Sequence, residues 1–178
     1  MMAMTDDCCL FYAGEGRTLG DFALVMRRLV LEEESQYSYR NTLVAMDDSG
    51  IVRGISVAYN GADLPALREA FFRIMREELG RVFEGFTDET QAGEYYLDSL
   101  AVYPSYRHLG IASALITSTA SLAHGLGLPL GLLVDKGNPT AERLYTALGF
   151  RYVNDTHWGG HPMRHLQLPV PRAQASFS

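Results

Sequence analysis

The chain has 178 residues, of which 47% are hydrophobic, and this length and composition fit one globular domain with a substantial core. The formal net charge of −6 at pH 7 argues against a nucleic-acid partner and mildly favours cationic partners such as amines. No apolar run approaches the roughly 18 residues of a membrane span, and Met1–Asp7 lacks the basic and apolar regions of a signal peptide, so we expect a cytoplasmic protein with no membrane partner.

The first expected elements are a strand and a helix. An apolar run over residues 8–13 predicts a first β-strand. Thr18 is a suitable N-cap, because apolar residues then recur at helical spacing at Phe22, Val25, Met26, Leu29 and Val30. The acidic run Glu32–Glu34 follows at the end of this helix. It is either a solvated face or a border of the substrate site that attracts a protonated amine.

A hairpin and a second helix come next. The apolar runs 42–46 and 51–59 flank a short turn-rich connection, which predicts two antiparallel strands. Residues 63–84 then show a helical pattern, with charged side chains such as Arg68 placed away from the apolar face. The apolar face comprises Leu64, Leu67, Phe71, Ile74, Met75, Leu79 and Val82. Residues 85–93 are polar enough for a mobile loop.

The segment 94–116 predicts a strand, a tight turn and the start of a helix. Residues 96–103 form an apolar, partly aromatic strand that Pro104 closes, since proline cannot donate to a sheet ladder. A helix then begins near Gly110. The opening turn of a helix has unpaired N–H groups and partial positive charge, so this turn can cradle a phosphate, and Arg107 adds a full charge. Many such turns nevertheless carry a glycine for packing alone and bind nothing.

The segment 128–150 predicts a second strand followed by a second capped helix. Residues 128–134 have the composition of a buried strand. Asn138 lies where an N-cap belongs, Pro139 at the first helical position and Gly149 just past the last turn. These signals define both ends of the helix.

The last part of the chain predicts two more strands, at 150–155 and 163–168, joined by a loop. His157, His161 and His165 are spaced by four, but the glycines and proline between them exclude the continuous helix that would align three metal ligands. We therefore expect no metal site. The loop is instead a candidate lining of an acceptor pocket, where its aromatic side chain can face a cation.

Two motifs carry a resemblance to a known family. Arg107, Gly110 and Ala112 resemble the Arg/Gln-x-x-Gly-x-Gly/Ala loop of the GCN5-related N-acetyltransferase (GNAT) superfamily, with alanine in place of the more usual second glycine. A second set of residues resembles the second cofactor motif of the family, in the same order and spacing: Asn138, Ala141, Leu144, Tyr145, Gly149 and Phe150. The match is specific over residues 94–152 and only architectural elsewhere.

The resemblance implies the GNAT fold, of the α/β (α+β) class. Its mixed central sheet of about six to seven strands contains a splayed parallel pair, here 96–103 and 128–134, and is flanked by helices. Residues 1–170 would form a single acetyltransferase domain, in which 60–93 is a helical insertion between the hairpin and the central strand. Residues 171–178 would be a disordered tail. A homodimer is common in the family and is an expected state here.

The resemblance also implies acetyl-CoA as the acyl donor. Its pyrophosphate would bind the amides of the turn, and its pantetheine arm would lie between the strands at 100–102 and 131–134. Gly131 would permit that approach, or serve packing alone. Asn138 would cap its helix and also hold the arm. The expected cofactor-binding residues are Leu100, Ala101, Val102, Arg107, His108, Leu109, Gly110, Ile111, Ala112, Ser113, Asn138 and Ala141.

Two residues are expected to be catalytic. Tyr145 follows Ala141 by four residues and matches the general acid of the family, a phenol that protonates the departing sulfur; packing of its helix is the alternative. Asp98 shares a strand face with Leu100 and Val102, and burial there would raise its pKa toward values suited to a base. Structural hydrogen bonds would also explain it. Water is another candidate base, as are Glu33, Glu34 and Glu94.

We therefore expect an acetyl-CoA-dependent N-acetyltransferase that acts on the primary amine of a small molecule or a peptide. One alternative is a catalytically silent, CoA-binding regulatory module. Others are a GNAT enzyme with another acyl donor, or one that acts on aminoacyl-tRNA, against which the negative charge argues.

Overall fold

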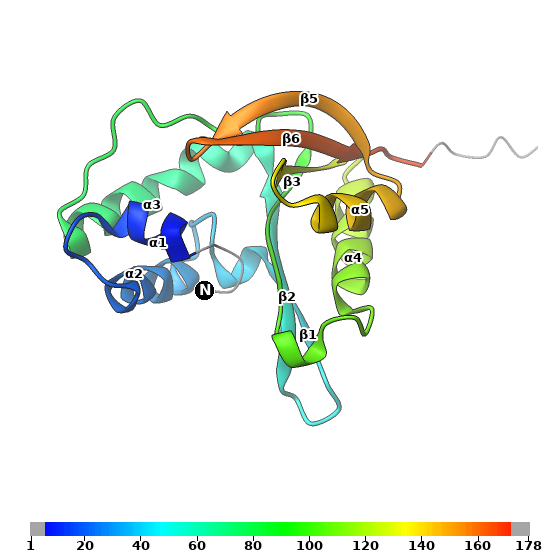
Figure 1. Ribbon diagram of the computed structural model, residues 1–178, viewed down its shortest axis with the longest axis horizontal. Helices are drawn as coiled ribbons and strands as arrows, with labels where there is room; N and C mark the ends of the chain where they lie inside the picture. Colours follow the sequence, from blue (N-terminus) through cyan, green and yellow to red (C-terminus); the bar gives the residue numbers. More distant parts are fainter. Residues whose placement is uncertain (1–5, 172–178) are drawn as a thin grey trace, which may run out of the picture.

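A six-stranded mixed sheet forms the centre of the protein, in the order β1-β2-β3-β4-β6-β5. The computed structural model describes residues 6–171. Helices α1, α2 and α3 lie on one side of the sheet, and α4 and α5 lie on the other (Figure 1). This mixed sheet with one parallel pair, flanked by helices, is the fold class that the sequence predicted. The expectations about Met1–Thr5 and residues 172–178 concern segments outside the described residues.

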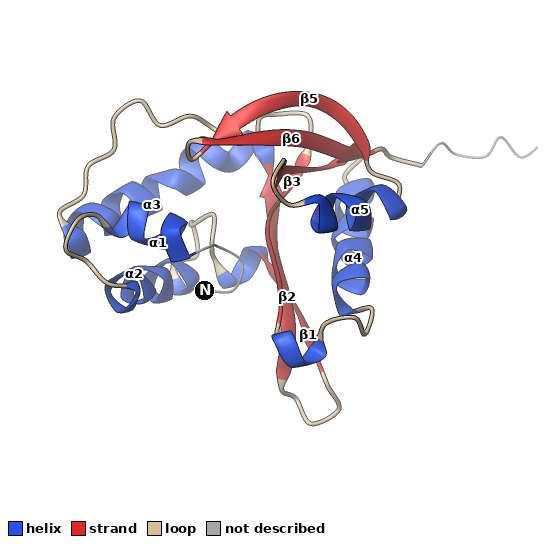
Figure 2. Cartoon of the chain, in the orientation of Figure 1, coloured by secondary structure: helices blue, strands red, loops and turns tan. Residues whose placement is uncertain are grey.

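Figure 2 distinguishes the helices from the strands, and the colours of Figure 1 give their order along the chain. The helices are α1 (Asp6–Ala13), α2 (Leu19–Leu31), α3 (Leu64–Leu79), α4 (Ile111–Gly125) and α5 (Pro139–Ala147). The strands are β1 (Thr42–Met46), β2 (Val52–Asn60), β3 (Tyr95–Val102), β4 (Leu130–Asp135), β5 (Arg151–Trp158) and β6 (His161–Leu168). Within residues 6–171, no helix has the length and apolar character needed to cross a membrane.

The first element is a helix, so the prediction of a strand over residues 8–13 was wrong. Cys9, Tyr12 and Ala13 are buried, and their i, i+3, i+4 spacing belongs to one helix face. Asp6 and Asp7 lie in the first turn, where carboxylates stabilise the helix dipole. A short apolar run is compatible with a strand or a helix, and here the side chains that pack against it favour the helix.

Helix α2 begins where predicted. The Thr18 hydroxyl accepts the Asp21 N–H at 3.2 Å, and the Asp21 carboxylate accepts the Thr18 N–H at 2.8 Å, which is a complete capping box. Phe22, Val25 and Leu29 are fully buried on its inner face. The helix ends at Leu31, before the acidic run.

Helix α3 is shorter than the predicted span of 63–84, because Gly80 adopts a left-handed conformation with φ +67° and ends it. Arg68 was placed away from the apolar face, and this was wrong: only 3% of it is exposed. It follows Leu64 by four residues and precedes Phe71 by three, so it occupies the buried stripe of the helix.

Strand β3 contains a β-bulge at Asp98. Val57 of β2 pairs with Ser99 and Ala58 with Leu97, which leaves Asp98 as the extra residue. The expected shared face of Asp98 and Leu100 was therefore wrong. Leu100 packs with Leu97 in the core cluster on the α4 side, because the bulge interrupts the alternation of side chains.

The parallel strands β3 and β4 are paired only at their beginnings. Tyr95 pairs with Leu130 and Tyr96 with Gly131, and no further pair follows. Strand β4 stays paired with β6 along its whole length, from Leu130 to Asp135. The two parallel strands thus separate beyond Tyr96, which is the splay that the sequence predicted.

The last two strands form a longer hairpin than predicted. Strands β5 and β6 reach Trp158 and His161, so the expected loop is reduced to Gly159 and Gly160. Both glycines have positive φ, at 58° and 81°, as a tight two-residue turn requires. His157 therefore belongs to β5.

Candidate functional site

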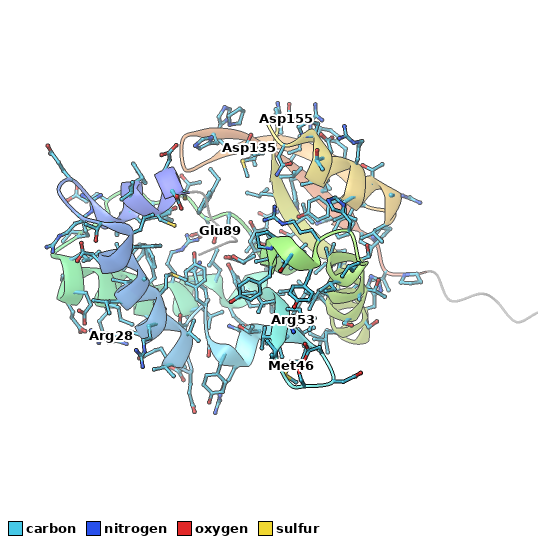
Figure 3. The ribbon with its side chains drawn as sticks, turned by 60° about the horizontal axis from the view of Figure 1, so that its bottom comes forward. Arg28, Met46, Arg53, Glu89, Asp135 and Asp155 are labelled. Carbon is cyan, nitrogen blue, oxygen red and sulfur yellow. The ribbon has the colours of Figure 1, made fainter. Side chains whose placement is uncertain are left out.

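A cavity of about 240 Å³ lies at the point where β3 and β4 separate. Asp98 and Ser99 come from β3, and Leu133 and Asp135 from β4. Its other walls include Tyr37, Glu89, Tyr96, Trp158, His161 and Met163. Figure 3 shows Glu89 between the helical layer and the sheet, and Asp135 at the upper end of the sheet. The cavity therefore borders the opening between the two strands.

Asp98 contributes a carboxylate of β3 to the cavity. Its Oδ2 accepts hydrogen bonds from the Tyr59 hydroxyl at 2.8 Å and from Gln36 Nε2 at 3.4 Å, and its Oδ1 accepts one from the Ser99 hydroxyl at 2.8 Å. Burial raises the pKa of Asp98, and these hydrogen bonds offset only part of the effect. The expected structural hydrogen bonds of Asp98 are present. A carboxylate with a raised pKa is also a stronger proton acceptor, and the role of Asp98 as a base stays a prediction.

Tyr145 lies on the opposite face of the sheet from Asp98. It packs in the α4-side cluster, where its ring centroid is 5.6 Å from that of Phe150. Burial raises the pKa of its phenol, so the hydroxyl keeps its proton at neutral pH. Within the described structure no contact joins Tyr145 to Asp98, because the two side chains lie on opposite faces of the sheet. The gap between β3 and β4 is an opening from one face to the other.

The predicted phosphate turn has the backbone geometry of an anion cradle. His108 and Gly110 both have positive φ, at 63° and 79°. The first backbone hydrogen bond of α4 joins the Ala114 N–H to the Gly110 carbonyl at 3.0 Å, so the amides of Ile111 and the next two residues have no acceptor within residues 6–171. Arg107 is exposed beside them, and its Nε donates to the Val102 carbonyl at 3.4 Å.

Asn138 and Gly131 each have a local explanation. The Asn138 side-chain oxygen accepts the Ala141 N–H at 3.1 Å, which caps α5 and leaves the side-chain NH₂ as a donor. A Cβ at Gly131 would lie 1.9 Å from Oε2 of Glu94, so the glycine is required by a neighbouring carboxylate. This packing reason makes a cofactor unnecessary as an explanation of Gly131.

Comparison with known proteins identifies the family. The family model described as "Acetyltransferase (GNAT) family" matches residues 32–150. The chain belongs to the GNAT acetyltransferase family. A search of the curated proteins found no match.

Solved structures agree with this GNAT assignment. A crystal structure of an acetyltransferase is 26% identical, with a TM-score of 0.70, and the match covers 96% of this chain and 98% of that one. An N-acetyltransferase from Staphylococcus aureus Mu50 is 21% identical, with a TM-score of 0.78, over 94% of this chain and 98% of that one. At 21% identity the second likeness shows the fold alone.

Glu89 lines the cavity, and the sequence did not indicate it. It is 8% exposed, forms an ion pair with Arg68, and accepts the indole N–H of Trp158 at 3.2 Å. Its other oxygen accepts from Tyr59 at 3.3 Å and Gln36 at 3.4 Å, the same two donors that contact Asp98. Two carboxylates that contact the same two side chains lie close together, so Glu89 and Asp98 belong to one buried polar cluster.

The signal for this pair was present but weak. Arg68 interrupts the apolar stripe of α3, and a charged residue in such a stripe requires a buried partner. The partner lies 21 residues away in a polar segment that reads as solvated loop. Charge alone does not distinguish Glu89 from its neighbour Asp88, whose side chain is 52% exposed.

The other candidate acids lie outside this cavity. Glu94 is 2% exposed, and hydrogen bonds from His165, Thr90 and Gln167 outweigh the effect of burial and lower its pKa. Glu33 pairs with Arg40 at 2.8 Å and accepts a hydrogen bond from the Tyr39 hydroxyl at 3.2 Å. Neither Glu33 nor Glu34 is among the residues that line the cavity at the strand opening.

The three histidines are separated as well. His165 Nε2 lies 2.7 Å from a Glu94 oxygen, whereas His161 Nδ1 lies 3.2 Å from Asp135 and borders the cavity. His157 lines a different hollow, next to Phe11. Residues 6–171 contain no group of three histidine, cysteine or acidic side chains arranged to hold a metal ion.

Proposed function

We propose that this GNAT chain is an acetyl-CoA-dependent N-acetyltransferase that acetylates a primary amine. The observation that carries the proposal is the cavity at the strand opening, with Asp98 on one side and Tyr145 on the other face of the sheet. An amine that approaches from the helical layer then meets an acyl donor held between the strands.

In this proposal, the donor is held by backbone groups. The free amides at the start of α4, with Arg107 beside them, suit a diphosphate. The edge of β3 from Leu100 to Val102 has lost β4 as its partner, so backbone groups that point away from β2 are available to amides of a pantetheine arm, except for the Val102 carbonyl, which accepts from Arg107. Asn138 offers its side-chain NH₂ to the same arm, next to Ala141. When bound, acetyl-CoA supplies an acyl thioester whose C–S bond breaks as the C–N bond forms.

Asp98 and Tyr145 would handle the two protons of the transfer. The ionised carboxylate of Asp98 takes a proton from the amine nitrogen, directly or through one water, which leaves a neutral amide. The Tyr145 phenol gives its proton to the departing sulfur and recovers one from solvent. Their positions on opposite faces keep the acid and the base from exchanging protons with each other.

The test is release of the free thiol from acetyl-CoA with a panel of primary amines. We expect Asp98→Asn and Tyr145→Phe each to lower kcat by about 100-fold, the lower end of general acid–base catalysis. In the wild type, kcat/KM should fall as the pH drops through the raised pKa of Asp98, and Asp98→Asn should remove that limb. Tyr152→Phe, at a side chain on β5 that is 60% exposed, is the control and should keep full activity.

Binding of the cofactor is measured separately, by thermal shift with acetyl-CoA. Both variants should bind it as the wild type does, because neither is proposed to hold the diphosphate. Tight binding without thiol release for any amine would contradict the proposal and favour a CoA-binding regulatory module.

A further inference from the structure

A second, larger groove lies on the same face of the sheet as Asp98. Its volume is about 630 Å³, within the range of small-molecule sites, which span roughly 300–1,000 Å³. Helix α2 contributes Met26 and Val30, and the three strands β1, β2 and β3 contribute Val44, Ile55 and Ala101 among others. No side chain that lines it carries a charge. The groove is thus suited to bind an apolar group.

The groove adjoins the cavity. Tyr37 and Ser99 line both, and Ser99 follows Asp98 directly in the bulge of β3. A molecule seated in the groove can therefore extend one end past Ser99 to the carboxylate of Asp98. The cavity offers that end carboxylates, whereas the polar side chains of the groove are uncharged hydroxyl groups.

We propose that the acceptor is a small primary amine with one apolar body. The amine lies beside Asp98 and the body fills the groove, where burial of each methylene is favourable. A second ammonium group in the groove would be desolvated without a carboxylate to pair with, so diamines and polyamines are disfavoured. This inference rests on the proposed N-acetyltransferase function, and its product is the N-acetyl amide of a lipophilic amine.

The test compares amines of equal length and different ends. n-Hexylamine and 1,5-diaminopentane have the same number of heavy atoms, and a methyl group in the first replaces an ammonium group in the second. From propylamine to hexylamine, kcat/KM should rise about fourfold per methylene, the effect of about 0.8 kcal/mol each. Hexylamine should exceed the diamine by about 30-fold or more, because an unpaired polar end is costly to bury.

A matched pair of variants probes the groove itself. Val44 lines it and is 46% exposed, whereas Leu122 lies on α4, on the opposite side of the sheet, and is 49% exposed. Val44→Glu should lower kcat/KM for hexylamine about 10-fold and raise it for the diamine, since the new carboxylate pairs with the second ammonium. Leu122→Glu should leave both values unchanged.

Each outcome decides the question. No thiol release with any amine refutes the proposed function. Turnover of the diamine at the rate of hexylamine, or turnover confined to peptides, overturns the acceptor class while acetyl transfer stands. If Val44→Glu dissociates a dimer and leaves the preference for chain length unchanged, the groove is a subunit interface and the inference fails.

Discussion

The buried ion pair between Arg68 and Glu89 gives the sharpest stability prediction. Their side chains are 4% and 3% exposed, so Arg68→Met leaves a carboxylate in the interior without its counter-ion. Removing one partner of a buried pair typically costs about 3–5 kcal/mol. Glu89 keeps two neutral donors, Gln36 and Trp158, because the single Tyr59 proton goes to the nearer Asp98, and we therefore expect the lower end, about 3 kcal/mol.

The loss should depend on pH. Without Arg68, burial favours the neutral form of the Glu89 carboxyl, so the carboxyl is protonated at low pH and the penalty of a buried charge disappears. As the pH rises from the unfolded to the folded pKa, the penalty grows by about 1.4 kcal/mol per unit of separation. Arg68→Met should therefore be closest to the wild type near pH 5 and furthest from it near pH 8.

The measurement is urea unfolding of both proteins at pH 5, 6.5 and 8. Arg73→Met is the control, because Arg73 lies on the same helix and pairs with Glu32 through side chains that are 45% and 39% exposed. An exposed pair contributes at most about 1 kcal/mol. Equal losses in the two variants, or a loss for Arg68→Met that does not change with pH, would refute this account of the pair.

Three further predictions concern local packing and protonation. Gly131→Ala should destabilise the fold by about 2–4 kcal/mol, because its Cβ displaces the bonded Glu94 carboxylate; the cost should fall in a Glu94→Ala background, as a double-mutant cycle by urea unfolding would measure. Thr18→Ala removes the capping box and should lower stability by about 1 kcal/mol, seen as a lower midpoint in urea with an unchanged slope. Asp98→Asn should gain stability relative to the wild type as the pH rises from 4 to 7, since the raised pKa of Asp98 means that ionisation costs folding free energy there; a constant difference in urea unfolding across that range would contradict it.

The sequence predicted correctly those helices whose capping residues lie next to them in the chain. Helix α2 begins after Thr18 and α5 after Asn138, because each of these side chains accepts a backbone N–H of its own first turn. The splay of β3 and β4 was predicted by the resemblance and agrees with the two observed pairs. Such features depend on a few neighbouring residues, and they are readable without knowing the rest of the chain.

Features that depend on distant partners were not predictable in the same way. Residues 8–13 form helix α1 because Tyr12 stacks on Phe22 and packs edge to face on Phe71. Both partners lie in other helices, so the run itself does not show them. Glu89 gained its place in the site from Arg68, Tyr59 and Trp158, which come from three different elements. The spacing of residues in the sequence does not predict the position of Glu89. Arg68 in the apolar stripe of α3 indicated only that a buried partner exists.

The bulge at Asp98 determines most of the site's layout. In a regular strand, Ser99 would face α4 and Leu100 would face the helical layer, because alternate side chains point to opposite faces. The extra residue places Asp98 and Ser99 consecutively on the cavity side and sends Leu100 into the α4-side core. One inserted residue therefore supplies the carboxylate, joins the cavity to the apolar groove through Ser99, and preserves the burial of Leu100. Without the bulge, the Leu100 side chain would point into the groove and the Ser99 hydroxyl would be buried against α4. Stability and the proposed acceptor site therefore both favour the bulge.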